Sequence, residues 1–421
     1  MGATARLGFL TVALALLCTP MLAGRSITDQ HSNVTVKYTG SVPVPGGFQG
    51  VIPEDVGAQG RLLLLGVPKR ATPDEPLLAF DIGKHRLLLP PTTVHWPELA
   101  GATASNNCVS PILRFLDSAG NRVVGLYGCF MVVIDLHKGA VRWSVRIPEI
   151  PHKYSLEDST RSFATALLAV DRRAQKFAVL VNNETMKEPE VFLYNGRFSV
   201  PLLHWRLPRF VQSAAWSPDG EKLAVLYSGF CDGNLNYYQV NIGRKKRNLL
   251  TLPDVAVFDA RTGHLDLSFF SGQPEGQIAY SPDGGVIYTI AGSDEAFVPS
   301  RALSVIRAFS AAGGKLVRTI HAPHTGVLSR FALSPDGKLI AADATTNPTW
   351  VWHDPPRIAV RFVLLDAATG RRLFEHQETW GGGDASATTL MFSPDGRTLI
   401  TDPLPATGEG PVEIYRLVGA P

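Results

Sequence analysis

The stretch AAWSPDGEKLAVL, residues 214–226, places the tetrapeptide Ser217-Pro218-Asp219-Gly220 between two apolar runs. Proline presets φ for the first corner of a turn, aspartate hydrogen-bonds to nearby backbone, and glycine takes the positive φ that closes the bend. The alternation of residues 222–226 is typical of a β-strand. We therefore predict a β-hairpin, in which the four turn residues determine backbone geometry.

The same tetrapeptide returns three more times, beginning at residues 281, 334 and 393. A second hairpin motif follows in phase with the first. It reads VFDARTG at 257–263, LLDAATG at 364–370 and, more weakly, VIDLHKG at 133–139. Two hairpins per period make four strands, which is the content of one β-propeller blade.

Degenerate copies of the two motifs extend the series toward the N-terminus. They are residues 116–121, residues 170–176 with 192–196, and residues 61–65 with 77–83. We predict an all-β fold, a single β-propeller over 25–421 with about seven four-stranded blades; six or eight blades are the alternatives. The approximate blades are 48–92, 110–150, 161–207, 211–270, 275–320, 327–377 and 386–418.

The last predicted blade has no room for a fourth strand before the sequence ends. Asn33–Tyr38 alternates as a strand does and is predicted to supply it. The ring would then be closed by pairing of the N- and C-terminal strands, which removes exposed sheet edges.

SPDG hairpins paired with D-x-x-T-G hairpins resemble the bacterial exported WD-repeat-like propellers, including the propeller of TolB. The resemblance covers essentially the whole chain after residue 24. It implies the fold and little about function, because these turn residues are structural wherever they occur. The Trp-Asp dipeptide of the eukaryotic repeat is replaced in this chain by Phe-Asp, Leu-Asp or Ile-Asp, which disfavours the eukaryotic signalling version.

Residues 1–24 have the layout of a secretory signal peptide: Arg6, an apolar run from Leu7 to Leu17, and the small residues Ala23-Gly24. We therefore expect a periplasmic or secreted protein; a retained N-terminal anchor is the alternative. No other stretch is long enough for a transmembrane helix.

Three cysteines remain after residue 24. In an oxidising compartment Cys108 and Cys129 are candidates for a disulfide, because they would flank the first strands of one blade. Cys231 is then left over, as a buried apolar thiol or an exposed reactive one.

The predicted hairpin turns all lie on one face of the disc, so the remaining connections open on the other face. That face has the long insertions at 227–255 and 342–359 and the long blade junctions. Long loops on a rigid scaffold are the usual place for binding. The candidate binding residues are a basic run, a tryptophan pair with its neighbours, two loop histidines and the entry to the last blade: Arg244, Lys245, Lys246, Arg247, Trp350, Trp352, His353, Asp354, His321, His324, Trp380 and Asp384.

The sequence has no G-x-S-x-G elbow, no H-E-x-x-H, no P-loop and no dinucleotide fingerprint. Proline between His321 and His324 excludes a simple helix face, and no Cys or Glu cluster accompanies them, so we predict no metal. The net charge of +3 gives no reason to expect nucleic acid.

We predict a non-catalytic binding module for a protein, peptide or glycan of the cell envelope, without a cofactor. The alternative is an enzyme or enzyme subunit with a site in the central funnel, as in the propeller dehydrogenase subunits, lyases and hydrolases that this fold resembles. Its polar groups would come from the blade junctions: His95, His321, His324, His353 and Asp384.

Overall fold

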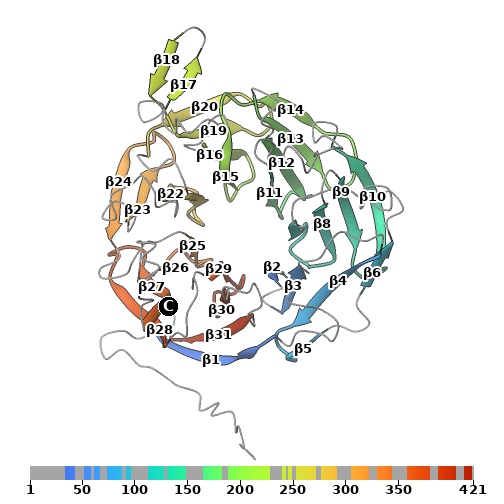
Figure 1. Cartoon of the computed structure of the whole chain (residues 1–421), viewed down its shortest axis with the longest axis vertical. Coiled ribbons are helices and arrows are strands. Elements are labelled where there is room, and N and C mark those ends of the chain that lie inside the picture. The colour runs from blue at the N-terminus through green and yellow to red at the C-terminus, as the bar shows by residue number, and fades with distance from the viewer. Residues whose placement is uncertain are drawn as a thin grey trace, which may run out of the picture.

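The computed structural model shows a ring of β-sheets (Figure 1). It describes residues 34–42, 52–57, 61–66, 74–87, 92–95, 112–127, 130–147, 165–182, 188–227, 239–242, 245–248, 253–271, 276–291, 305–321, 330–343, 358–379, 387–403 and 412–419. In these ranges the chain forms 31 strands and no helix.

Seven four-stranded sheets form the blades, and the strands of each blade are named from the inner edge outward. Blade 1 is β2 (Ile52–Gly57), β3 (Leu62–Gly66), β4 (Asp74–Asp81) and β5 (Arg86–Leu87), with β6 (Thr92–His95) also paired to β4; blade 2 is β7 (Ile112–Phe115), β8 (Arg122–Tyr127), β9 (Phe130–Asp135) and β10 (Ala140–Arg146). Blade 3 is β11 (Thr165–Asp171), β12 (Lys176–Asn182), β13 (Glu190–Asn195) and β14 (Leu203–Arg206); blade 4 is β15 (Val211–Trp216), β16 (Lys222–Tyr227), β19 (Val255–Asp259) and β20 (Leu265–Phe269). Blade 5 is β21 (Gly276–Tyr280), β22 (Val286–Ala291), β23 (Val305–Ser310) and β24 (Leu316–His321); blade 6 is β25 (Phe331–Leu333), β26 (Leu339–Asp343), β27 (Ile358–Asp366) and β28 (Arg372–Thr379). Blade 7 is β29 (Ala387–Phe392), β30 (Thr398–Pro403), β31 (Glu413–Val418) and, outermost, β1 (Thr35–Ser41).

The ring closes through blade 7. Its outer strand β1 comes from the N-terminal side of the chain and pairs antiparallel with β31, with Val36 opposite Leu417 and Tyr38 opposite Tyr415. The inner strands of blades 1 and 7, β2 and β29, also contact each other. The prediction of a seven-bladed propeller closed by N- and C-terminal strands is therefore confirmed.

The hydrophobic core is divided among the joints between blades. The described residues form seven apolar clusters, and each lies between two neighbouring blades. Phe115, Phe177, Phe331 and Phe362 are fully buried in these joints. Burial of one such side chain contributes about 1.5–3 kcal/mol, so packing of blade against blade is a major stabilising term.

The SPDG turns have one repeated hydrogen-bond pattern. In blade 4 the Ser217 hydroxyl donates to Asp219, and the same oxygen accepts the Lys222 N–H over 2.9 Å. Gly220 has a φ of +73°, which an L side chain rarely adopts. The pattern recurs in blades 5, 6 and 7, so the serine and aspartate of each turn are occupied by the turn itself.

The turns also join neighbouring blades. A Cβ added to Gly337 of blade 6 would lie 3.1 Å from Pro282 of blade 5, and one added to Gly284 would lie 3.4 Å from Pro218 of blade 4. Proline and glycine of successive SPDG turns therefore pack on each other. This second role is not visible in the sequence motif alone, because it depends on the turn in the next blade.

These turns predict a dependence of stability on pH. The Ser281 hydroxyl, followed by the Gly285 N–H, holds the pKa of the Asp283 carboxyl below its ordinary value of 3.8. A carboxyl with a lowered pKa in the folded state stabilises the fold above about pH 4, and the contribution is lost as the pH falls through the folded-state pKa. We expect the urea midpoint of Asp283→Asn to lie below the wild-type value at about pH 7, with the difference closing as the pH is lowered below 3.8 and through the folded-state pKa. A difference independent of pH would contradict this role.

Candidate functional site

Most of the predicted binding residues lie outside the described residues: Arg244, His324, Trp350, Trp352, His353, Asp354, Trp380 and Asp384. The same holds for residues 1–24 and for Cys108, Cys129 and Cys231. His321 is described; it ends β24, is exposed, and pairs through its backbone with Val305. Within the described ranges, no three His, Cys, Asp or Glu side chains lie close enough together to hold a metal ion.

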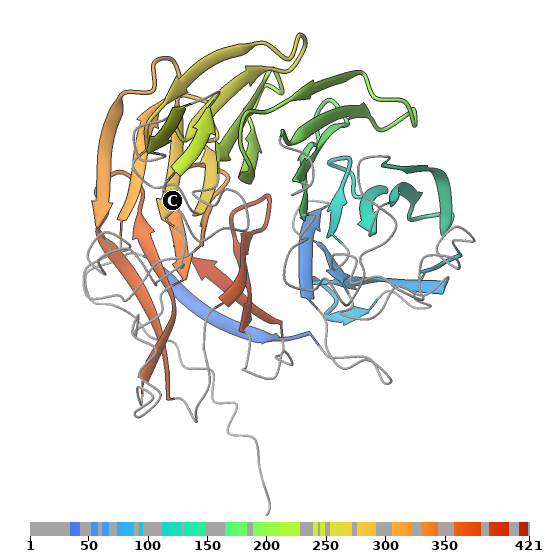
Figure 2. The same cartoon turned by 45° about the horizontal axis from the view of Figure 1, so that its top comes forward.

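The basic run at 244–247 lies partly in a hairpin that stands apart from the blades. Of the strands that the structure describes, β17 (Gln239–Ile242) pairs only with β18 (Lys245–Asn248), which places Val240 opposite Arg247 and Asn241 opposite Lys246. Figure 1 shows the hairpin beyond the outer edge of the ring, beside blade 4, and in the tilted view of Figure 2 it lies in front of the blades. The sequence predicted a long loop with binding residues at this point. It did not predict that part of this loop forms two paired strands.

The two faces of the ring differ in their connections. The face that bears the SPDG turns and the turns between third and fourth strands is called the turn face. The other, which receives the connections between second and third strands and between blades, is called the insertion face. The hairpin β17–β18 arises from the second-to-third connection of blade 4, so it belongs to the insertion face.

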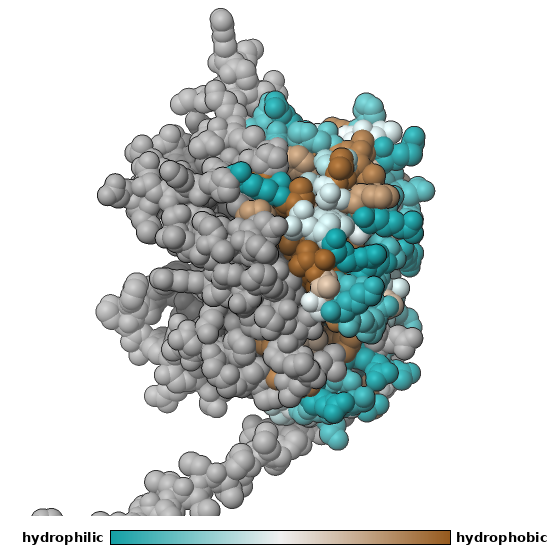
Figure 3. All heavy atoms as spheres, turned by 90° about the vertical axis from the view of Figure 1, so that its right-hand side faces the viewer, coloured by the Kyte–Doolittle hydropathy of each residue, from teal (hydrophilic) through white to brown (hydrophobic). Residues whose placement is uncertain are grey.

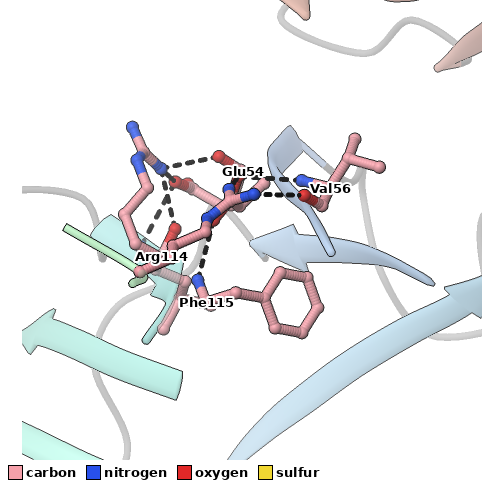
Figure 4. Close-up of polar contacts among 7 residues, drawn as sticks. Glu54, Val56, Arg114 and Phe115 are labelled. Atoms are coloured by element: carbon pink, nitrogen blue, oxygen red, sulfur yellow. Dashed lines mark hydrogen bonds and ion pairs between the residues drawn. The ribbon is translucent and has the colours of Figure 1, made fainter. Parts of the chain in front are cut away.

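A group of charged side chains joins the inner strands of blades 1 and 2 to blade 3, and is called the inner clamp: Glu54, Asp55, Arg114 and Arg172. Asp55 is buried, and its Oδ2 accepts the Phe115 N–H of blade 2 over 2.7 Å (Figure 4). Its Oδ1 accepts the Val56 N–H over 2.9 Å and a hydrogen bond from Arg172, which reaches over from blade 3.

Glu54 and Arg114 form the second half of the inner clamp. Arg114 Nη1 donates to Glu54 Oε2 over 2.9 Å and to the Glu54 carbonyl over 2.7 Å, as Figure 4 shows. Burial raises the pKa of Glu54, while the neighbouring guanidinium opposes the rise. A buried carboxyl with a raised pKa is one mark of a catalytic acid. Because both carboxylates already join strands of different blades, the geometry favours a structural role.

Other joints use neutral side chains for the same purpose. The Ser213 hydroxyl of blade 4 accepts the Ile278 N–H of blade 5 over 3.3 Å, and Gln277 Oε1 of blade 5 accepts the Phe331 N–H of blade 6 over 3.0 Å. An inner strand has an unpaired edge, and these contacts satisfy part of it. In the inner clamp, a carboxylate accepts the backbone N–H of the next blade, as a serine hydroxyl or a glutamine oxygen does at these other joints.

An apolar turn reaches the surface in blade 3, between β13 and β14. Phe198 is 61% exposed and Val200 is 69% exposed. In the side view of Figure 3, brown atoms gather in the upper part of the described surface, on the side of blade 3, with teal around them. A contiguous exposed apolar patch is one mark of a contact surface. Sequence reasoning missed this turn because every short turn was interpreted as structural.

No described helix is long and apolar enough to span a membrane.

No protein-family model and no curated protein matches the chain. The chain is similar in fold to a chain of the solved "Crystal Structure of Mitotic Checkpoint Complex", with a TM-score of 0.53 and 13% sequence identity over 98% of this chain and 99% of that one. In all, 1140 solved chains match, so the architecture alone does not select a function. The similarity shows the β-propeller fold, whereas membership in the bacterial exported propellers stays a prediction.

Proposed function

We propose that the chain is an exported, non-catalytic propeller that binds a protein partner in the cell envelope through its insertion face. The observation on which this rests is the hairpin β17–β18. Among the described strands it pairs with no blade, and its second strand places Lys245, Lys246 and Arg247 in succession. The signal-like segment 1–24 supports export, and membership in the bacterial exported propellers would agree with it.

The described strand pairing of the blade 4 sheet does not involve the insertion. Strand β16 pairs directly with β19, with Leu226 opposite Val255, and the Tyr227 N–H donates to the Asp254 carbonyl over 2.8 Å. In blade 2 the corresponding connection, between Tyr127 and Phe130, is only two residues long. A segment that the sheet does not need, with a run of basic residues, fits a docking element for an acidic surface of a partner.

The test removes the hairpin and leaves the ring. We expect replacement of residues 230–251 by a short Gly-Ser linker to shift the melting temperature by less than about 2 °C, because among the described residues no hydrogen bond of the blade 4 sheet involves this segment. Binding to the partner should weaken at least about tenfold.

The matched control reverses charge without deletion: Lys245→Glu with Lys246→Glu and Arg247→Glu. It should reproduce the loss of binding at unchanged melting temperature. Unchanged binding in both variants would contradict the proposed function, and a large fall in melting temperature would assign the hairpin a structural role.

A further inference from the structure

Blade 7 differs from the other blades at the end of its third strand. The Leu417 N–H donates to the Arg397 carbonyl over 2.8 Å, as the Ala260 N–H does to Glu221 in blade 4. The two strands are therefore in equivalent register. After this point blade 4 turns into its outer strand, whereas the outer strand of blade 7 is β1, supplied from the other end of the chain.

At the position where the turn between the third and fourth strands begins in blade 4, blade 7 has a residue of opposite charge. In blade 4 this position is Asp259, whose carboxylate accepts the Thr262 N–H over 2.8 Å and the Thr262 hydroxyl over 2.8 Å. In blade 7 the same position is Arg416, on the third strand and exposed. An arginine cannot accept the hydrogen bonds that close such a turn, so it has a different role in blade 7.

A groove of about 620 Å³ opens on the turn face at this place. It lies between the SPDG turns of blades 6 and 7 and the end of β31, and is called the closing groove. Its apolar wall includes Pro335, Pro394 and Val418, and its cations are Arg397 and Arg416. The volume is within the range of about 300–1,000 Å³ typical of ligand pockets.

The cations of the closing groove lack carboxylate partners among the described residues. Arg397 and Arg416 are exposed, and neither side chain has a hydrogen bond or ion pair within the described ranges. Exposed Lys37 of β1 is directly opposite Arg416, an arrangement of like charges that destabilises a sheet. The groove carboxylates Asp336 and Asp395 are held in their own turns by serine hydroxyls.

We propose that the closing groove binds an acidic peptide segment of a protein partner, with glutamate or aspartate side chains alternating with aliphatic ones. Two guanidinium groups suit carboxylates, since each can donate a pair of parallel hydrogen bonds. The proline and valine wall suits the aliphatic side chains between them. Inorganic phosphate would use the cations and leave this apolar wall exposed. The site lies on the turn face and is thus separate from the proposed function of the insertion face.

Fluorescence anisotropy with the full-length protein tests this proposal. The probe is a fluorescein-labelled six-residue peptide of alternating valine and glutamate, and its control has glutamine in place of glutamate. We expect the glutamate peptide to bind at least about tenfold more tightly than the glutamine peptide. Arg416→Gln and Arg397→Gln should each weaken binding about fivefold or more, while Lys315→Gln, which removes an exposed charge from the same face in blade 5, should leave it unchanged.

A stability measurement separates binding from structure. Because Arg416 opposes Lys37, we expect Arg416→Gln to raise the urea midpoint slightly while it weakens peptide binding. A lowered midpoint would assign Arg416 to the fold and overturn the proposal. Equal binding of the two peptides, an equal effect of Lys315→Gln, or complete displacement of the peptide by millimolar phosphate would overturn it too. The linker variant lacking residues 230–251 should bind the peptide normally, so the two proposals fail separately.

Discussion

Replacement of Asp55 by alanine is expected to lower the free energy of unfolding by about 3 kcal/mol. The side chain accepts the Phe115 N–H of blade 2 over 2.7 Å and the Arg172 guanidinium of blade 3, and it is 8% exposed. Its removal takes the carboxylate acceptor from the Phe115 and Val56 N–H groups, and it leaves the Arg172 guanidinium with the Val56 carbonyl but no carboxylate partner. Urea unfolding followed by tryptophan fluorescence measures the loss.

A double-mutant cycle tests whether the loss comes from the inner clamp. We expect Asp55→Ala and Arg172→Ala to couple by about 1 kcal/mol or more, because each removes the partner of the other. Additive effects of the two substitutions would show that Asp55 acts through its local backbone contacts alone. The matched comparison is Asp395→Ala, an exposed turn aspartate, for which we expect a smaller loss.

The second large effect is expected at Gly314, in the turn between β23 and β24. It has a φ of +65°, and a Cβ there would lie 2.6 Å from the ring of Phe269 in the outer strand of blade 4. Gly314→Ala combines a left-handed backbone with a clash against a buried aromatic ring. We expect a cost of about 2–4 kcal/mol, measured as the change in free energy of unfolding.

The neighbouring residue provides the control. A Cβ at Gly313 meets nothing within 4 Å, so Gly313→Ala should be neutral or stabilise by up to about 1 kcal/mol. Equal losses at the two glycines would contradict the packing argument. The same packing of a turn glycine against an aromatic ring of the preceding blade occurs between Gly263 and Trp205. Between blades 7 and 1 the roles are exchanged, because Gly40 lies on the outer strand and the ring of His85 lies in the turn.

The fold could be predicted from the sequence because its signals are local. The turn Ser217–Gly220 makes nearly all its hydrogen bonds within six residues, so the tetrapeptide alone specifies the hairpin. Repetition of the motif then indicated the blade, and a last blade that was too short indicated the closing strand. Each step needed only spacing and turn chemistry.

The sites were harder to predict because their residues are distant in sequence. Asp55 and Arg172 of the inner clamp are 117 residues apart, and no motif marks either one. The apolar turn at Phe198 depends on which side chains neighbouring blades leave uncovered. The closing groove did leave a sequence signal. Arg416 stands where the third strand of blade 4 has Asp259, and this exchange can be recognised once the blades are aligned.

The central claim is that the insertion face holds a protein partner. The most direct measurement is site-specific photocrosslinking in the native host, with a benzophenone side chain at Asn241 of β17. The control position is Thr319, exposed on the outer strand β24. The account predicts a specific protein adduct from Asn241 that Thr319 does not give and that disappears when Lys245, Lys246 and Arg247 are changed to glutamate. No protein adduct from Asn241, or the same adducts from both positions, would contradict it.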